Sequence, residues 1–175
     1  MQAKSTLGLL FAGLVVAAAL PSGAPAQGQG PFGGFKHDSK APIEITSDSL
    51  EVQQAQNLAV FSGDVEAGQG TLRLTADRVE VTYAEQSGGN AETGAIRNLQ
   101  AEGNVFISNG AETAQGSHAR YDVESGLITM TGNVVLTQGE NVISGETLTI
   151  NLNEGQGKVE GRVKSIFTPQ KKQTK

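Results

Sequence analysis

Two short sequence patterns recur in this chain with a common period of 29 residues, interrupted by one insertion. The first is a Gly-x-Val signal whose glycines are Gly63, Gly103, Gly132 and Gly161. The second has the form apolar-x-x-acid-x-apolar-x-apolar, and its central positions are Asp48, Asp77, Ser117 and Glu146. Four copies of the unit cover residues 43–167. A repeat of this length is one supersecondary unit that must stack on its neighbours to bury an apolar face.

Two copies depart from the common form. The interval from acid to glycine is 15 residues in three copies but 26 between Asp77 and Gly103. The excess of 11 matches Glu85 to Ala95, EQSGGNAETGA, a polar and glycine-rich stretch that predicts an inserted loop. The third copy is weakened, because Ala114 and Ala119 stand where the other copies have larger residues.

The apolar residues within each unit alternate with polar ones, which indicates β-strands. Leu72 and Leu74, then Val79, Val81 and Tyr83, keep a period of two, and no window has the 3, 4, 7 spacing of an amphipathic helix. We predict two extended segments in each unit, with a bulge or tight bend at the marker glycine, where positive φ or close backbone approach is needed. The recurring acids are predicted to be turn or strand-start residues.

Stacked units of this kind form either a solenoid or a jelly-roll-like sandwich. In both arrangements the terminal units carry open strand edges, here near residues 43–52 and 159–167. Alternation assigns one set of side chains to the interior: Ile45, Leu50, Val52, Phe61, Val65, Leu74, Val79, Val81, Leu99, Val105, Ile107, Tyr121, Ile128, Met130, Val134, Leu136, Ile143, Leu148, Ile150 and Val163. These residues form either a closed core or, if the sheets stay apart, an apolar groove for a lipid. The shortage of large aromatics indicates a poorly filled interior.

Composition excludes several classes of function. The 175 residues include 23 glycines and no cysteine, so a disulfide framework and a thiolate metal site are excluded. The net charge of −5 lacks the basic footprint of a nucleic-acid binder. Only His37 and His118 are present, and no P-loop, nucleophile elbow or zinc spacing occurs. We therefore predict neither enzymatic activity nor a cofactor, and we read His118 as an ordinary strand residue.

The two ends of the chain differ from the repeats. Residues 1–26 are predicted to be a signal peptide, with Lys4, an apolar run of 14 residues and the small-x-small site Ala24-Pro25-Ala26. Residues 27–41 read as a flexible leader and residues 168–175 as a basic, polar tail. The repeat domain therefore spans residues 42–167, and the mature protein is predicted to be exported.

Several motifs resemble the OstA-like family of periplasmic lipopolysaccharide-transport proteins. They are I-x-x-D-x-L-x-V from Ile45, V-F-S-G-D-V from Val60, L-x-A-D-R-V-x-V from Leu74, A-E-G-N-V from Ala101 and M-T-G-N-V-V-L from Met130. The resemblance covers residues 43 to about 167. It implies an all-β fold, an open and twisted antiparallel β-jelly roll with a solenoid-like stack of units and an apolar interior.

The resemblance also implies a function and partners. It implies a periplasmic protein that binds the acyl chains of lipopolysaccharide in the interior, with the twenty inward residues as the groove lining. An LptC-like inner-membrane partner is expected at the N-terminal edge and an LptD-like outer-membrane partner at the C-terminal edge, with head-to-tail self-association between them. A different class of protein, a secreted structural β-solenoid with a closed core and no lipid ligand, stays open from the residues alone.

Overall fold

The computed structural model describes residues 41–84 and 95–168, and most of these residues lie in strands. The strands are β1 (Ile43–Thr46), β2 (Ser49–Gln53), β3 (Leu58–Gln69), β4 (Leu72–Tyr83), β5 (Ile96–Ser108), β6 (Glu112–Asp122), β7 (Leu127–Gln138), β8 (Asn141–Asn151), β9 (Gln156–Glu160) and β10 (Lys164–Ile166). A short 3-10 turn, η2 (Gln54–Gln56), joins β2 to β3. Within these ranges no helix has the length and apolar character that crossing a membrane requires.

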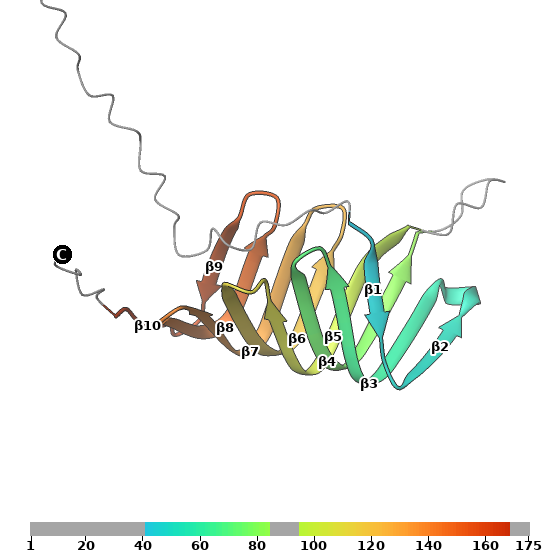
Figure 1. Ribbon diagram of the computed structural model, residues 1–175, viewed down its shortest axis with the longest axis horizontal. Coiled ribbons are helices and arrows are strands. Elements are labelled where there is room, and N and C mark those ends of the chain that lie inside the picture. Colours follow the sequence, from blue (N-terminus) through green and yellow to red (C-terminus); the bar gives the residue numbers. More distant parts are fainter. Residues whose placement is uncertain (1–40, 85–94, 169–175) are drawn as a thin grey trace, which may run out of the picture.

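All these strands belong to one antiparallel sheet. Its order is β1-β3-β4-β5-β6-β7-β8-β10, while β2 also pairs with β3 and β9 also pairs with β8. The long strands β3 to β8 thus occupy the middle, and two short strands share each end. Figure 1 shows the strands stacked along the long axis, with β1 and β2 at one end and β9 and β10 at the other. Within the described ranges the sheet ends at these strands, in agreement with the edges predicted near residues 43–52 and 159–167.

The long strands bend near their middle, and the bends fall at the repeat markers. The four marker glycines have φ between 77° and 87°, and the residue after each has φ between 41° and 54°. The register of β3 against β4, for example, shifts between Ser62 and Val65, around Gly63. Two successive residues with positive φ turn the chain sharply, which glycine allows because it has no Cβ. The predicted bends are confirmed, and we call this line of bends the corner.

The two repeat markers lie against each other at the corner. A Cβ added to a marker glycine would come within 3.0 Å of the side chain at the other marker, pairing Gly63 with Asp48, Gly103 with Asp77, Gly132 with Ser117 and Gly161 with Glu146. Only Asp48, between β1 and β2, is a turn residue. Asp77 and Glu146 were predicted to lie in turns or at strand starts, and this was wrong. These acids lie in the middle of β4 and β8, where the strand bends beside the marker glycine of the neighbouring strand.

The corner divides the sheet into two leaves. Leaf A comprises β1, β10 and residues 65–69, 72–76, 105–108, 112–116, 134–138 and 141–145; leaf B comprises β2, β9 and residues 58–62, 78–83, 96–102, 118–122, 127–131 and 147–151. The hairpin turns lie on the side away from the corner, which we call the mouth. Buried residues of both leaves form one apolar cluster between them. The predicted fold, an open antiparallel β-jelly roll with an apolar interior, is confirmed.

Several predictions fall outside the described residues. They are the signal peptide at 1–26, nearly all of the leader at 27–41, nearly all of the inserted loop at 85–95 and the tail beyond residue 168. The flanking residues Ala84 and Ala95 are joined by a backbone hydrogen bond in which the Ala84 N–H donates to the Ala95 carbonyl at 2.8 Å. The insertion therefore leaves and re-enters the sheet at adjacent points.

Candidate functional site

The interior between the leaves contains most of the side chains that alternation assigned to it. Fifteen of the twenty are buried: Val65, Leu74, Val79, Val81, Leu99, Val105, Ile107, Tyr121, Ile128, Met130, Val134, Leu136, Ile143, Leu148 and Ile150. Ile45 and Phe61 are partly buried and pack against this cluster. Contact of these residues with a lipid stays a prediction.

Three of the twenty predicted residues are exposed at the ends of the sheet. Leu50 and Val52 of β2 are 55% and 59% exposed, and Val163, between β9 and β10, is 51% exposed. Leu50 and Val52 pair with Phe61 and Ala59, so they share the inward face, but no further strand of the described chain covers them. Period-two alternation reports which face a residue lies on and says nothing of whether a neighbouring strand is present.

Small and polar interior residues were missed by the sequence analysis. The cluster includes six alanines: Ala59, Ala67, Ala76, Ala101, Ala114 and Ala119. Glu112 and Gln69 are also buried, and each continues the inward alternation at the end of a leaf A strand. Extending the period-two alternation by one step, from Ala67 to Gln69 and from Ala114 back to Glu112, would have predicted that both residues face the interior.

The weakened third copy does not leave a gap. Ala114 and Ala119 of β6 are both buried, and a Cβ added to the adjacent Gly116 would meet the Val134 and Met130 side chains of β7 at 3.4 and 3.5 Å. Larger residues of the next strand therefore fill the space beside the small ones. The small residues of β6 make the interior narrow rather than empty.

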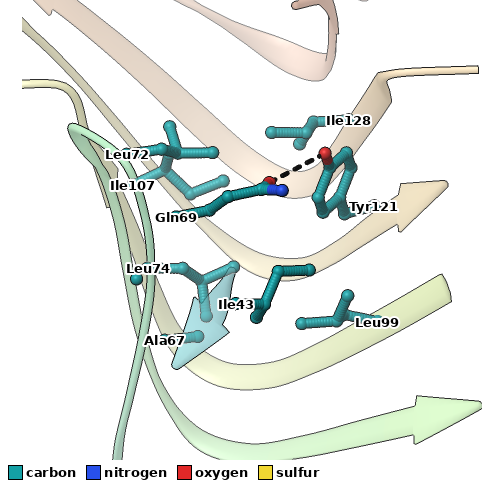
Figure 2. A pocket seen from close by; sticks show the side chains of 10 residues that line it. Ile43, Ala67, Gln69, Leu72, Leu74, Leu99, Ile107, Tyr121 and Ile128 are labelled. Carbon is teal, nitrogen blue, oxygen red and sulfur yellow. Dashed lines mark hydrogen bonds between the residues drawn. The ribbon is translucent and has the colours of Figure 1, made fainter. Parts of the chain in front are cut away.

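A small cavity lies in the interior near the N-terminal end. Leaf A contributes Ile43, Ala67, Leu72, Leu74 and Ile107 to its lining, and leaf B contributes Leu99, Tyr121 and Ile128, as Figure 2 shows. Its volume is about 30 Å³, which is room for water but far too little for an acyl chain. This cavity leaves little free space at the N-terminal end of the interior, and the expectation of a poorly filled interior stays a prediction.

Among the residues that the structure describes, the buried polar side chains Gln69 and Glu112 lie near the mouth. The Tyr121 hydroxyl donates to Oε1 of Gln69 at 3.0 Å, and Nε2 of Gln69 donates to the Ala41 carbonyl at 3.0 Å. Farther along the sheet, Nε2 of Gln138 donates to Oε1 of the buried Glu112 at 2.6 Å. Within the described interior, polarity thus increases from the corner to the mouth.

The environment of Tyr121 moves the pKa of its phenol farther above the physiological range. Burial raises the pKa of the Tyr121 phenol, and the neighbouring Asp122 carboxylate raises it further. The pKa of Asp122 is itself lowered, mainly by hydrogen bonds from the Ser125 hydroxyl and backbone N–H. The Tyr121 hydroxyl therefore remains a hydrogen-bond donor across the physiological range.

The described residues offer no arrangement typical of catalysis. No group of three or more His, Asp or Glu side chains among them could hold a metal ion. His118 is an exposed residue of β6, opposite Glu102 and Thr131 in the neighbouring strands. The recurring acids are spread along the corner, each beside its own glycine. The chemically distinctive feature is an apolar interior with a polar rim.

A bent, open antiparallel sheet with an apolar interior defines the class of open β-jelly-roll proteins. The family model described as LptA/(LptD N-terminal domain) LPS transport protein matches residues 44–156. The chain therefore belongs to this family of lipopolysaccharide-transport proteins.

Individual proteins are similar to this chain over most of its length. An uncharacterized Rhizobium meliloti protein, R00383, is 32% identical over 94% of this chain and 89% of its own length. The lipopolysaccharide export system protein LptA of Escherichia coli K12 is 26% identical over 98% of this chain and 90% of its own length. The crystal structure of Pseudomonas aeruginosa LptH, titled a periplasmic component of the lipopolysaccharide transport device, superimposes with a TM-score of 0.65 at 19% identity, covering 75% of this chain and 99% of that one.

Proposed function

We propose that this protein binds the acyl chains of lipopolysaccharide between its two leaves and carries the lipid across the periplasm without catalysing a reaction. The observation that carries the proposal is the continuous apolar cluster lined by both leaves, combined with membership of a lipopolysaccharide-transport family. Burying one CH₂ group contributes about 0.8 kcal/mol, so even a partly inserted acyl chain gains several kcal/mol.

The narrow interior specifies how such binding would occur. Because the present cavity is only about 30 Å³, acyl chains can enter only if the leaves separate at the mouth while the corner stays joined. The energy of separating the leaves offsets part of the gain from burying the chains. A carrier benefits from this offset, because several fully buried chains would exceed the practical limit of about −20 kcal/mol for noncovalent affinity and would not be released.

The second candidate function is a structural scaffold with a permanently closed core. The well-filled interior is the observation that favours it. A lipid-binding measurement separates the two candidates directly, since a closed scaffold binds no lipid.

The groove is tested by placing a charge inside it. Leu148 of β8 and Val134 of β7 are buried in the interior, and we expect Leu148→Asp and Val134→Asp to weaken displacement of a fluorescent lipid by lipopolysaccharide at least tenfold, because a carboxylate there is costly to bury. Thr129→Asp, on the exposed face of β7, is the matched control and should bind normally. Circular dichroism identifies the variants that stay folded, and normal lipid binding by folded interior variants would contradict the proposal.

We also propose that copies of the chain join head to tail, with LptC-like and LptD-like partners at the N-terminal and C-terminal edges of the row. One family model describes both LptA and the LptD N-terminal domain, so a similar sheet edge is expected on an LptD-like partner. The directions of the terminal strands support continuation of the sheet: β1 runs from mouth to corner in leaf A and β10 from corner to mouth, so β10 and the next copy's β1 would be antiparallel. The same holds for β9 and β2 in leaf B.

The internal repeat specifies the register of this junction. Inside the chain, the glycine-bearing β3 pairs with the acid-bearing β4, and Phe61 lies opposite Val79. At the junction, β9 and β10 would correspond to β3, and β1 and β2 of the next copy would correspond to β4. Val159 is then equivalent to Phe61 and Leu50 to Val79, so Val159 lies opposite Leu50 of the next copy. The exposed inward side chains at the two ends would then cover each other.

Charges at the two ends fit the same register. Residues 42–53 contain Glu44, Asp48 and Glu51 but no basic residue, whereas residues 156–167 contain Lys158, Arg162 and Lys164 and a single acid. Transferring the β3–β4 pairing places Lys158 opposite Glu51 of the next copy and Arg162 beside Asp48 of the next copy. Pairs of opposite charge across strands favour this alignment over others.

A disulfide tests the register, because the natural chain has no cysteine. Directly opposed residues of antiparallel strands have Cα atoms about 4.5 to 5.5 Å apart, within the range of a disulfide. We expect the double variant Leu50→Cys with Val159→Cys to form disulfide-linked multimers on a non-reducing gel after mild oxidation. The control, Glu51→Cys with Val159→Cys, places the thiols on opposite faces and should not. Equal cross-linking of both variants, or of neither, would contradict the register.

A further inference from the structure

A polar hollow lies on the outer face of leaf A, at the N-terminal end of the sheet and outside the apolar interior. Its volume is about 560 Å³, and its lining includes Glu44 and Thr46 of β1, Glu66 and Gly68 of β3 and Arg73 of β4. In the described sheet β1 is the terminal strand of leaf A at this end (Figure 1). The hollow therefore borders the edge to which a further strand would be added.

The hollow forms because the middle of its floor has no side chain. Gly68 lies opposite Glu44 on one side and Arg73 on the other. The guanidinium of Arg73 folds over this glycine, where an added Cβ would meet Nη1 at 3.1 Å. Nη1 also donates to the carbonyl oxygens of Gly70 at 2.7 Å and Leu72 at 2.9 Å. The basic group of the lining is thus held against the backbone.

Two carboxylates flank the hollow. Glu44 and Glu66 are exposed and lie on adjacent strands, and because Glu66 pairs with Thr46, the two acids are diagonal neighbours on the same face. Neither acid takes part in an ion pair within the described part of the chain. Like charges closer than about 10 Å repel each other at ordinary ionic strength. A cation between them would relieve this repulsion, so the hollow has the charge to receive a basic side chain.

The repeat predicts which side chain the neighbouring edge strand would bring to the hollow. β10 is equivalent to the second half of β3, and Lys164, three residues after the fourth marker glycine, is equivalent to Glu66. Inside the chain, Glu66 lies opposite Thr75 of β4, whose equivalent in β1 is Thr46. At a head-to-tail junction in the same register, Lys164 therefore lies opposite Thr46 of the next copy, on the outer face.

We propose that the hollow is a socket for Lys164 of the preceding copy, whose ammonium group lies between Glu44 and Glu66. The proposal rests on the proposed head-to-tail association and adds a contact that specifies its direction. Thr46 is small and leaves the path from Lys164 to Glu66 open. Neighbouring strands are about 4.8 Å apart, a distance that the flexible four-carbon stem of lysine can cross. Glu44 is then the diagonal neighbour of Lys164.

The socket favours one way of joining two edges over the others. Two N-terminal edges brought together would place Glu44 and Glu66 of both copies near one another without a cation. Two C-terminal edges would bring two copies of Lys164 together without an acid. Like charges on adjacent strands are unfavourable, so both arrangements are disfavoured. The N-terminal edge therefore fits a partner strand that carries a basic side chain on its outer face in this register.

Zero-length cross-linking of the natural chain tests the contact directly. A water-soluble carbodiimide joins a lysine amine to a carboxylate when the two groups are in contact, and mass spectrometry of the digested product identifies the pair. A mixture of isotope-labelled and unlabelled chains shows whether the link lies between copies. We expect a peptide that joins Lys164 of one copy to Glu44 or Glu66 of another. Links between copies that never include Lys164 would overturn the socket.

Exchanging the charges separates the socket from a general effect of charge. We expect Lys164→Glu to weaken association about tenfold in sedimentation, because it replaces attraction by repulsion. Adding Glu66→Lys in the same chain should restore association to within about threefold of the natural chain. The control adds Glu102→Lys instead, which gives the same net charge, and Glu102 is an exposed residue of β5 in leaf B. This control should stay as weak as Lys164→Glu alone.

The outcomes distinguish the socket from the junction itself. Equal association of the two double variants, with multimers of the natural chain still present, would overturn the socket and leave head-to-tail association intact. If the natural chain forms no multimers and Leu50→Cys with Val159→Cys does not cross-link, the junction and the socket are wrong together. Circular dichroism identifies folded variants, and for any variant that does not fold, the cross-linking of the natural chain gives the answer.

Discussion

The corner and the mouth of this sheet are stabilised in different ways. At the corner, backbone geometry repeats four times, with a glycine at φ near 80° packed under the side chain of the facing marker. At the mouth, the contacts are side-chain hydrogen bonds that differ from one strand to the next, such as Tyr121 to Gln69 and Gln138 to Glu112. The comparison indicates that repeated backbone geometry defines the corner, whereas individual side-chain contacts define the mouth.

The largest effect is expected at the corner. Gly132→Ala adds a Cβ within 3.0 Å of the Ser117 side chain at a φ of 87°, so we expect a loss of about 2 to 4 kcal/mol in the free energy of unfolding. Gly139→Ala is the control, because Gly139 has a φ of 57° but open space around it, and it should lose only about 1 kcal/mol. Urea unfolding followed by circular dichroism measures both. Equal losses would show that the tight contact between markers does not stabilise the corner.

A smaller effect is expected at the mouth at alkaline pH. The pKa of Tyr121 is raised above its ordinary value of 10.0 by burial and by Asp122. A group with a raised pKa in the folded state contributes stability below its unfolded pKa and loses it as pH rises, so this contribution should disappear above pH 10. The absorbance of tyrosinate in a Tyr83→Phe variant, where Tyr121 is the remaining tyrosine, should titrate above 10.0 in the folded state. A midpoint at or below that value would contradict the buried contact.

The smallest effect is expected at the last bend, where the pattern of the corner is broken. The residue after the marker glycine is Asp64, Asn104 or Asn133 in the first three bends but Arg162 in the fourth, at a φ of 43°. Asparagine tolerates this conformation better than arginine, so Arg162→Asn should stabilise the monomer by about 0.5 kcal/mol.

The same substitution should weaken the proposed head-to-tail association about twofold to fourfold, because it removes the charge pair that the proposed register places between Arg162 and Asp48 of the next copy. Lys164→Asn is the matched control. It removes a positive charge from the same edge, but Lys164 does not have a positive φ, so this variant should weaken association without stabilising the monomer. Sedimentation at low and high salt measures association. Stronger association of Arg162→Asn than of the natural chain would contradict the charge pairing.

The parts of the fold that repeat were predictable from the sequence. The spacing of Gly63, Gly103, Gly132 and Gly161 located the bends, because a backbone requirement for glycine is visible in every copy. The open edges followed from the same repeat. The roles of Asp77 and Glu146 were misjudged because a polar residue in a strand pattern suggests a turn, whereas here the strand continues through the bend.

The mouth was much less predictable. Gln69 and Tyr121 are 52 residues apart and belong to different copies, so no local spacing connects them. Glutamine and glutamate at strand ends look like solvated rim residues in a single sequence. Their burial depends on packing against residues from several strands, which a single sequence does not reveal.

The paired short strands at each end have a consequence for length. At one end of the described sheet, β1 and β2 together take the place of one long strand and carry the acidic marker Asp48. At the other end, β9 and β10 take the place of one long strand and carry the marker glycine Gly161. The described sheet therefore contains a whole number of units, each made of one acid-bearing and one glycine-bearing strand. Inserting or deleting one unit would therefore leave both edge strands unchanged, and the proposed head-to-tail contacts with them. Each unit adds about 10 Å, since strands are spaced about 4.8 Å apart. The span of such a protein can thus change in fixed steps without redesign of its ends.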